Sequence, residues 1–315
     1  MDNHRVLGRQ RGLSEPSVKR NKSIVKWAYA NLTAYLLVFP AIVLLFIFHL
    51  YPMCMTFFLS LTDWNLIAPD FNWIFAGNYT KMLTSSEFWK VVGNTFIFGV
   101  FSVGFTVLLA TVLAVVLDEK LRGVRLFRSV VFLPYITPMA AIGTLWVWMY
   151  SQDFGLINWA LGLFSIPPAP WLAKPGWAMV ALIITKVWKV VGYYMVVLLA
   201  GKQNIAESLY EAAKMDGAGK LQLFKHITMP LLSPYIFFVL IVALIGAFED
   251  FDLLYSMTRG GPAESTNMMI YYIYQHAFDF FDIGYASAAA TALFVILLLI
   301  TFIQMKVSKR WVHYQ

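Results

Sequence analysis

Charged side chains lie inside two strongly apolar runs of this sequence. Lys186 and Lys189 stand one helical turn apart in one run, and Glu249, Asp250 and Asp252 stand near the end of another. An ionised group at the centre of a bilayer costs about 3 kcal/mol or more unless it faces a partner or water. Three interpretations follow: the groups pair to hold helices together, they line the pathway of a polar solute, or Glu249, Asp250 and Lys189 relay protons in an ion-coupled transporter.

A polar stretch between the same two runs has the pattern of a helix, a turn and a second helix. From 205 to 215 apolar residues recur at helical spacing opposite a charged face, and Gly217 follows as a helix C-cap requires. We expect a second short helix at 220–228, ended by Pro230, with Ser233-Pro234 starting the next helix. Such an amphipathic unit can lie in a partner's groove. The predicted apolar face comprises Ile205, Leu209, Ala212 and Ala213, and the charged face Glu207, Glu211 and Lys214.

The sequence supports neither an ATP-binding loop nor a metal site. Gly217-Ala-Gly-Lys220 resembles the end of a phosphate-binding loop, but Lys214 occupies the first glycine position and Leu221 replaces the serine or threonine. We therefore expect no ATP site, no catalytic residue and no cofactor in this chain. The five histidines and the single cysteine, Cys54, show no metal-ligand spacing, so no metal site is predicted.

Composition places these stretches in a polytopic membrane protein. The 315 residues are 60% hydrophobic and 13% charged, whereas a soluble domain is nearer half apolar and a quarter charged. Each apolar run is long enough to cross a bilayer, which takes about 20 residues. We expect an all-α fold of six spans, at about 32–53, 94–117, 126–150, 176–199, 235–255 and 284–305.

The basic residues fix the orientation of these spans. With the N-terminus inside, 18 Lys and Arg lie in the four cytoplasmic segments and 4 in the three external loops. That asymmetry follows the positive-inside rule and places both termini in the cytoplasm. The net charge of +7 therefore reflects membrane topology and predicts no nucleic-acid partner. We expect a cytoplasmic tail at 1–30, a permease-like domain at 31–306 with the polar loop at 201–233, and a second tail at 307–315.

The polar loop resembles the signature of permease subunits of binding-protein-dependent ABC importers: Glu-Ala-Ala, three residues, Gly, nine residues, Ile, one residue, Leu-Pro. This chain has Glu211-Ala212-Ala213, Gly217 and Ile227, with Met229-Pro230 in place of Leu-Pro. Further stretches are similar to the carbohydrate-uptake, maltose-type branch, and the resemblance covers most of the chain apart from the N-terminal tail. These stretches are 120–128, 132–135, 153–158 and 258–262.

The resemblance implies a mechanism and a set of partners. The partners would be a homologous second permease, two cytoplasmic ATPase subunits that hydrolyse the ATP, an external binding protein, and a carbohydrate. The location would be the bacterial inner membrane, and the solute would cross by alternating access. In the family the loop helix sits in a cleft of the ATPase and transmits its closure to the spans. The implied coupling residues are Glu207, Glu211, Ala212, Ala213, Asp216, Gly217 and Pro230.

The resemblance also bears on the solute pathway. In maltose-type permeases the matching part of span five lines the sugar cavity with amides, whereas this chain has carboxylates, which accept hydrogen bonds from hydroxyls. Nearby aromatic rings could stack on sugar faces, although aromatics form 17% of the chain and most pack or sit at interfaces. A polyol or sugar-phosphate permease remains an alternative, as does an ion-coupled transporter. The pathway candidates are Lys189, Tyr193, Tyr194, Glu249, Asp250 and Tyr255.

Overall fold

The computed structural model describes residues 32–118, 123–309 and 312. Within these ranges the regular elements are helices, and the one β-type contact is an isolated antiparallel bridge between Thr62 and Trp73. Five helices are long and apolar enough to cross a membrane, or six if one bent pair is a single span, so the expected all-α membrane fold is confirmed. The N-terminal tail lies outside the described residues. The chain divides into two compact units, Met1–Cys54 and Met55–Gln315.

The first unit is helical from its first described residue. It contains α2 (Leu32–Leu45), the π-helical η1 (Phe46–Leu50) and the start of α3 (Tyr51–Leu59). The stretch Ala34–Leu59 is a candidate span of 26 residues, enough to cross a hydrocarbon core of about 30 Å. Its side chains are apolar around the whole circumference and exposed, as a helix in contact with lipid requires.

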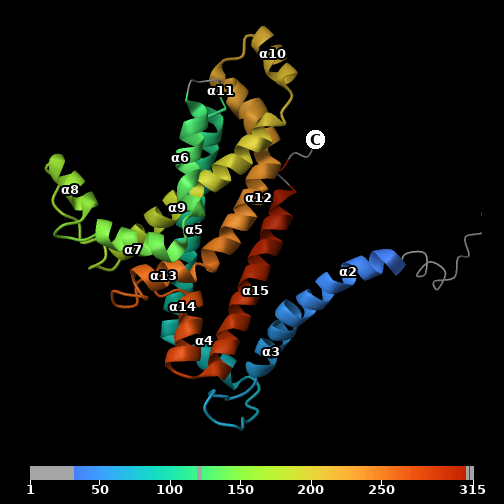
Figure 1. Cartoon of the computed structure of the whole chain (residues 1–315), viewed down its shortest axis with the longest axis vertical. Coiled ribbons are helices and arrows are strands. Elements are labelled where there is room, and N and C mark those ends of the chain that lie inside the picture. Colours follow the sequence, from blue (N-terminus) through green and yellow to red (C-terminus); the bar gives the residue numbers. More distant parts are fainter. Residues whose placement is uncertain (1–31, 119–122, 310–311, 313–315) are drawn as a thin grey trace, which may run out of the picture. The chain divides into compact units, whose positions relative to one another are not determined.

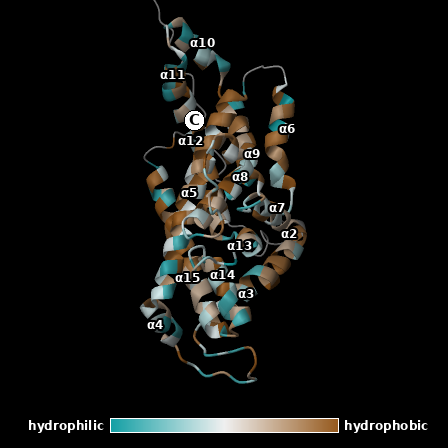
Figure 2. Ribbon diagram, turned by 90° about the vertical axis from the view of Figure 1, so that its left-hand side faces the viewer, coloured by the Kyte–Doolittle hydropathy of each residue, from teal (hydrophilic) through white to brown (hydrophobic). Residues whose placement is uncertain are grey.

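The second unit is a bundle of long helices joined by short ones (Figure 1). Short helices α10 and α11 lie at one end of it, and α4 lies at the opposite end (Figure 1). Hydrophilic residues gather at α10 and α4, while the long helices between them are mainly hydrophobic (Figure 2). The elements are α4 (Gly77–Thr84), α5 (Ser86–Val116), α6 (Val124–Ile136), α7 (Met139–Met149), α8 (Leu156–Leu163), α9 (Trp177–Gln203), α10 (Glu207–Met215), α11 (Lys220–Leu223), η2 (Phe224–Thr228), α12 (Met229–Phe248), α13 (Phe251–Met257), α14 (Met269–Tyr274), η3 (Gln275–Asp279) and α15 (Ile283–Ser308).

Helix α9 is the centre of the second unit. Its most apolar window is 72% buried, against 28–44% for the other spans of this unit. It packs against α5, α6 and α12. Close approach to α6 depends on Gly192, because a Cβ there would lie 2.1 Å from the carbonyl oxygen of Val131. The charges predicted inside a span, Lys186 and Lys189, are therefore on the helix with the least access to lipid.

Local sequence explains where α5 begins. Ser85 is its N-cap, and the Ser85 hydroxyl accepts a hydrogen bond from the backbone N–H of Phe88 at 3.3 Å. Glu87 stands in the first turn, where a negative charge suits the helix dipole. The helix thus starts eight residues before the span expected at 94. Its 31 residues make it about 46 Å long, so its ends extend beyond the hydrocarbon core.

The third span is not the continuous helix expected at 126–150. Helix α6 ends at Ile136, and α7 leaves it at 101°. The cause is Pro138, because a residue before proline is pushed out of the helical region, and Thr137 is accordingly extended. A second break follows α12, at Glu249 and Asp250. The short helices beyond the two breaks, α7 and α13, pack against each other.

The expected stop at Pro230 is wrong. Helix α11, η2 and α12 form one span, Lys220–Phe248, and Pro230 lies within the first two residues of α12. Proline is tolerated at such a position because the π-helical turn before it already changes the backbone pairing. Ser233 is likewise no N-cap: its hydroxyl donates to the Pro230 carbonyl at 2.6 Å within the helix. The span five expected at 235–255 therefore starts at the polar loop and ends at Phe248.

We predict that Gly192→Ala destabilises the bundle. The added methyl group meets the α6 backbone, and such overpacking costs about 1–3 kcal/mol. The thermal unfolding midpoint of the purified protein should fall. Gly104→Ala in α5 is the control, because nothing lies within 4 Å of its Cβ position and its midpoint should stay the same or rise. Equal midpoints for the two variants would show that α9 and α6 are not in close contact.

Candidate functional site

The polar loop folds as an exposed amphipathic helix with a sharp stop. Helix α10 begins at Glu207, two residues after the predicted start, and contains no buried residue. Gly217 has φ +82°, a left-handed conformation that favours glycine, and the Ala218 N–H donates to the Ala213 carbonyl at 2.9 Å. The predicted C-cap is confirmed. The predicted coupling residues Glu207, Glu211, Ala212, Asp216 and Gly217 are exposed, and Ala213 and Pro230 are half-buried.

Two hydrogen bonds join α10 and the end of α9 to the span Lys220–Phe248. The hydroxyls of Tyr210 in α10 and Thr228 in η2 are 3.0 Å apart. The Asn204 amide at the end of α9 donates to the Tyr235 hydroxyl of α12 at 2.9 Å. Helix α10 and the end of α9 are therefore both in direct contact with the helix that leads into α12. Sequence reasoning did not find these ties, because nothing in the spacing of Tyr210 and Thr228 marks them as partners.

The inner ends of two spans meet beside the loop. Lys202 in the last turn of α9 pairs with Asp118 just after α5 at 2.8 Å. A cavity of about 860 Å³ lies between this pair and α10. Both acidic and basic side chains line it, including Glu207, Glu211 and Lys214. This face of α10 can bind a polar partner surface, while Leu209 and Met215 offer exposed apolar contacts.

The two lysines of α9 bind the two helix breaks. Lys189 Nζ donates to the carbonyls of Pro134, Tyr135 and Thr137, at 3.0, 3.0 and 2.6 Å, where α6 ends. Lys186 Nζ lies 2.5 Å from Asp250 Oδ2 in the second break, and both side chains are only 10% exposed. Within the described part of the chain Lys189 forms no ion pair. The arrangement supports the structural interpretation of Lys189, Lys186 and Asp250, since each satisfies a buried polar group.

The other pathway candidates lie in three places. Tyr193 stacks on Tyr135 with ring centroids 4.4 Å apart, and Tyr194 packs edge-on against Tyr193. Glu249 is exposed at the second break. Tyr255 belongs to a separate aromatic cluster on α13 and α14, where it contacts three rings and the Arg259 guanidinium. The structure thus brings Tyr193 and Tyr194 together near the first break and leaves Tyr255 among α13 and α14.

Comparison with known proteins agrees with this geometry. Residues 106–314 match the family described as "Binding-protein-dependent transport system inner membrane component". The chain is 33% identical to the trehalose/maltose transport system permease protein MalF of Thermococcus litoralis, over 91% of this chain and 97% of that one. It is 36% identical to the lactose transport system permease protein LacF of Rhizobium radiobacter, over 88% of this chain and 94% of that one.

A solved structure has the same fold. A chain of a bacterial alginate ABC transporter, in complex with an alginate pentasaccharide-bound periplasmic protein, superposes with a TM-score of 0.79. The match covers 91% of this chain and 97% of that one, at 23% identity. The fold and the polar loop therefore define a multi-pass membrane permease subunit. The chain belongs to the family of binding-protein-dependent transport system inner membrane components.

We predict that Lys186→Met is strongly destabilising. It leaves the Asp250 carboxylate buried and unpaired, and breaking such a pair costs about 3–5 kcal/mol. The unfolding midpoint of the purified protein should fall sharply, and the double variant Lys186→Met, Asp250→Leu should recover most of the loss.

The matched control is Lys81→Met, which breaks the exposed pair with Asp282. Exposed pairs contribute about 0–1 kcal/mol, so its midpoint should barely move. If Lys186→Met behaved like this control, the pair in the break would be open to water and available to a solute.

Proposed function

We propose that this chain is a permease subunit of an ATP-driven importer that moves a sugar or oligosaccharide into the cytoplasm. The observation that carries the proposal is α10, an exposed amphipathic helix that ends at a glycine in the left-handed conformation and is hydrogen-bonded to the span that follows it. Two relatives are permease proteins of a trehalose/maltose and of a lactose transport system, which supports the carbohydrate class. ATP hydrolysis would belong to two partner ATPase subunits, and this chain would perform no covalent chemistry.

The loop geometry supports a specific path of coupling. An ATPase that draws α10 inward would pull on Thr228 through Tyr210, and on α12 behind it. The ends of α9 and α12 would move together because Asn204 is bonded to Tyr235. Glu207, Glu211 and Asp216 would supply polar contacts to the ATPase cleft, and Ala212 and Ala213 would permit close approach. A second, homologous permease would complete the pathway, and an external binding protein would deliver the sugar.

The breaks suggest where the sugar passes. Glu249 is exposed at the second break and could accept hydrogen bonds from sugar hydroxyls, with Tyr193 and Tyr194 near the first break as stacking surfaces. Lys189 and Asp250 would hold the breaks in place around that pathway rather than bind sugar. A proton relay through Lys189 is less favoured, because its ammonium is held by three carbonyls.

We predict that Glu211→Lys abolishes sugar uptake while the protein remains in the membrane. A hydrogen bond to a charged group contributes about 1.5–3 kcal/mol, so the ATPase should bind tenfold or more weakly and fail to co-purify. Uptake of radiolabelled disaccharide by cells and pull-down of the ATPase measure the two effects.

Asp70→Lys, a charge reversal on an exposed loop at the opposite end of the second unit, should leave ATPase co-purification intact. Unchanged uptake in Glu211→Lys, together with loss of uptake when a protonophore collapses the proton gradient, would instead establish an ion-coupled transporter.

A further inference from the structure

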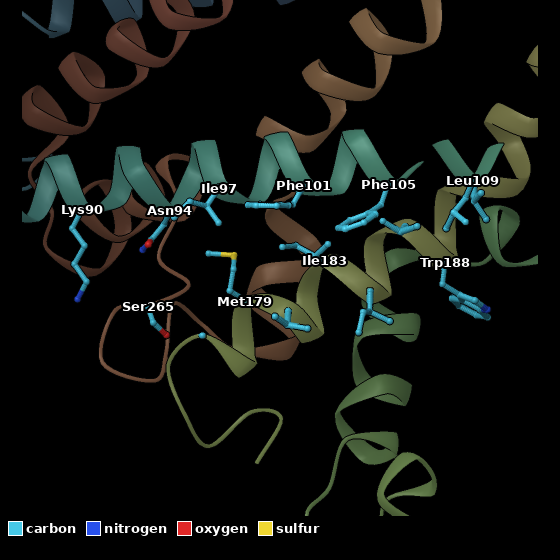
Figure 3. A pocket seen from close by; sticks show the side chains of 15 residues that line it. Lys90, Asn94, Ile97, Phe101, Phe105, Leu109, Met179, Ile183, Trp188 and Ser265 are labelled. Atoms are coloured by element: carbon cyan, nitrogen blue, oxygen red, sulfur yellow. The ribbon is translucent and has the colours of Figure 1, made fainter. Parts of the chain in front are cut away.

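A large apolar groove runs between α5 and α9 on a face that the coupling loop and the helix breaks do not use. Its volume is about 1010 Å³. Figure 3 shows side chains of the two helices facing it from opposite sides. The α5 side includes Ile97, Phe101 and Phe105, and the α9 side includes Met179, Ile183 and Trp188.

The length of the groove is comparable to the depth of one leaflet of a bilayer. At 1.5 Å per residue its lining spans about 22 Å along α9, from Gly176 to Val191, and about 28 Å along α5, from Lys90 to Leu109. A bilayer with its headgroups is about 40–45 Å thick, so one leaflet is about half of that. The groove opens at the outer ends of α5 and α9 under the topology given by the basic residues.

Apart from the indole N–H of Trp188 at the other end, the polar side-chain groups of the lining gather at that outer end. Lys90, Asn94 and Ser265 lie together there (Figure 3). The Lys90 ammonium donates to the Ala263 carbonyl at 2.8 Å and forms no ion pair within the described ranges. The Ser265 hydroxyl is buried and has no hydrogen-bond partner among the described residues. The end of the groove therefore presents an uncompensated positive charge and an unused hydroxyl.

Two carboxylates stand near this end and do not cancel the charge. Glu87 precedes Lys90 by one helical turn and is exposed to water. The Glu264 carboxylate accepts a hydrogen bond from the Asn267 amide at 2.6 Å. The amide of Asn94 is also occupied, because it donates to the carbonyls of Glu264 and Asn267. Lys90 and Ser265 are thus the two groups left to meet a ligand.

We propose that this groove is a binding site for a glycerophospholipid with an anionic headgroup from the outer leaflet. The phosphate accepts hydrogen bonds from the Lys90 ammonium and the Ser265 hydroxyl, and an acyl chain lies along Phe101, Ile183 and Trp188. A sugar does not fit, because the lining below the entrance is apolar. A transmembrane helix could bring only the free carbonyls of its last turn or a side chain to the outer end, and the quenching experiment separates it from a lipid.

Quenching of Trp188 by brominated lipid tests the site directly. The full-length protein, with the subunits that co-purify, is placed in phosphatidylcholine nanodiscs containing a minor fraction of phosphatidylglycerol with brominated acyl chains. The Trp188 signal is the difference from the same sample of Trp188→Phe. We expect about a fivefold preference for brominated phosphatidylglycerol over brominated phosphatidylcholine, as one lysine near the surface provides. Lys90→Gln should abolish that preference.

Lys81→Gln is the matched control, since Lys81 is also an outer-end lysine but is paired with Asp282 away from the groove. It should keep the preference for phosphatidylglycerol. Equal quenching by the two brominated lipids would mean that bulk lipid fills the groove and would overturn the proposal. Quenching by neither lipid would also overturn it, because a membrane helix, from this chain or another subunit, would then cover Trp188.

Discussion

The structure depends on one constraint: polar groups at membrane depth must find partners inside the protein. One helix break leaves backbone carbonyls, and the other a carboxylate, in need of partners. Side chains of the single helix α9 pair with the polar groups of both breaks. Lys189 donates to three carbonyls at the end of α6, and Lys186 pairs with Asp250 beyond α12. Because the two lysines are one turn apart on α9, the breaks are held at nearby levels, and α7 and α13 can pack together beyond them.

The same helix connects these breaks to the cytoplasmic loop. Helix α9 is continuous from Trp177 to Gln203, so one unbroken helix connects its inner end to the two breaks. At that end Lys202 pairs with Asp118, and Asn204 is bonded to Tyr235 of α12. The span that starts at Lys220 reaches the second break at Phe248 without interruption. Displacement of α10 therefore has two continuous helices through which it can reach the breaks.

Much of this follows from sequence, and what does not has identifiable causes. Hydropathy predicted that the chain consists of membrane-spanning helices because lipid imposes their length and apolar character, whereas the direction indicated by the basic residues stays a prediction. The Gly217 stop was predictable because its conformation is rare for other residues. Whether the helix stops at Pro230 or continues through it was not predictable, since proline is tolerated in the first turn of a helix as well as beyond its end. Partners such as Lys189 and the carbonyl of Thr137 are far apart in the chain, and no spacing rule connects them.

The charges inside the membrane show why residue type alone does not assign a role. A lysine in a span suits a proton relay, a solute pathway or a structural tie equally well until its neighbours are known. Here Lys189 has its three donors directed at three carbonyls, so releasing a proton or binding a solute would break or weaken those hydrogen bonds. Glu249 differs because it is exposed and one residue from a carboxylate that is already paired. Burial and pairing thus distinguish two adjacent acids: the Asp250 side chain is only 10% exposed and is paired at the break, and Glu249 is exposed and outside that pair.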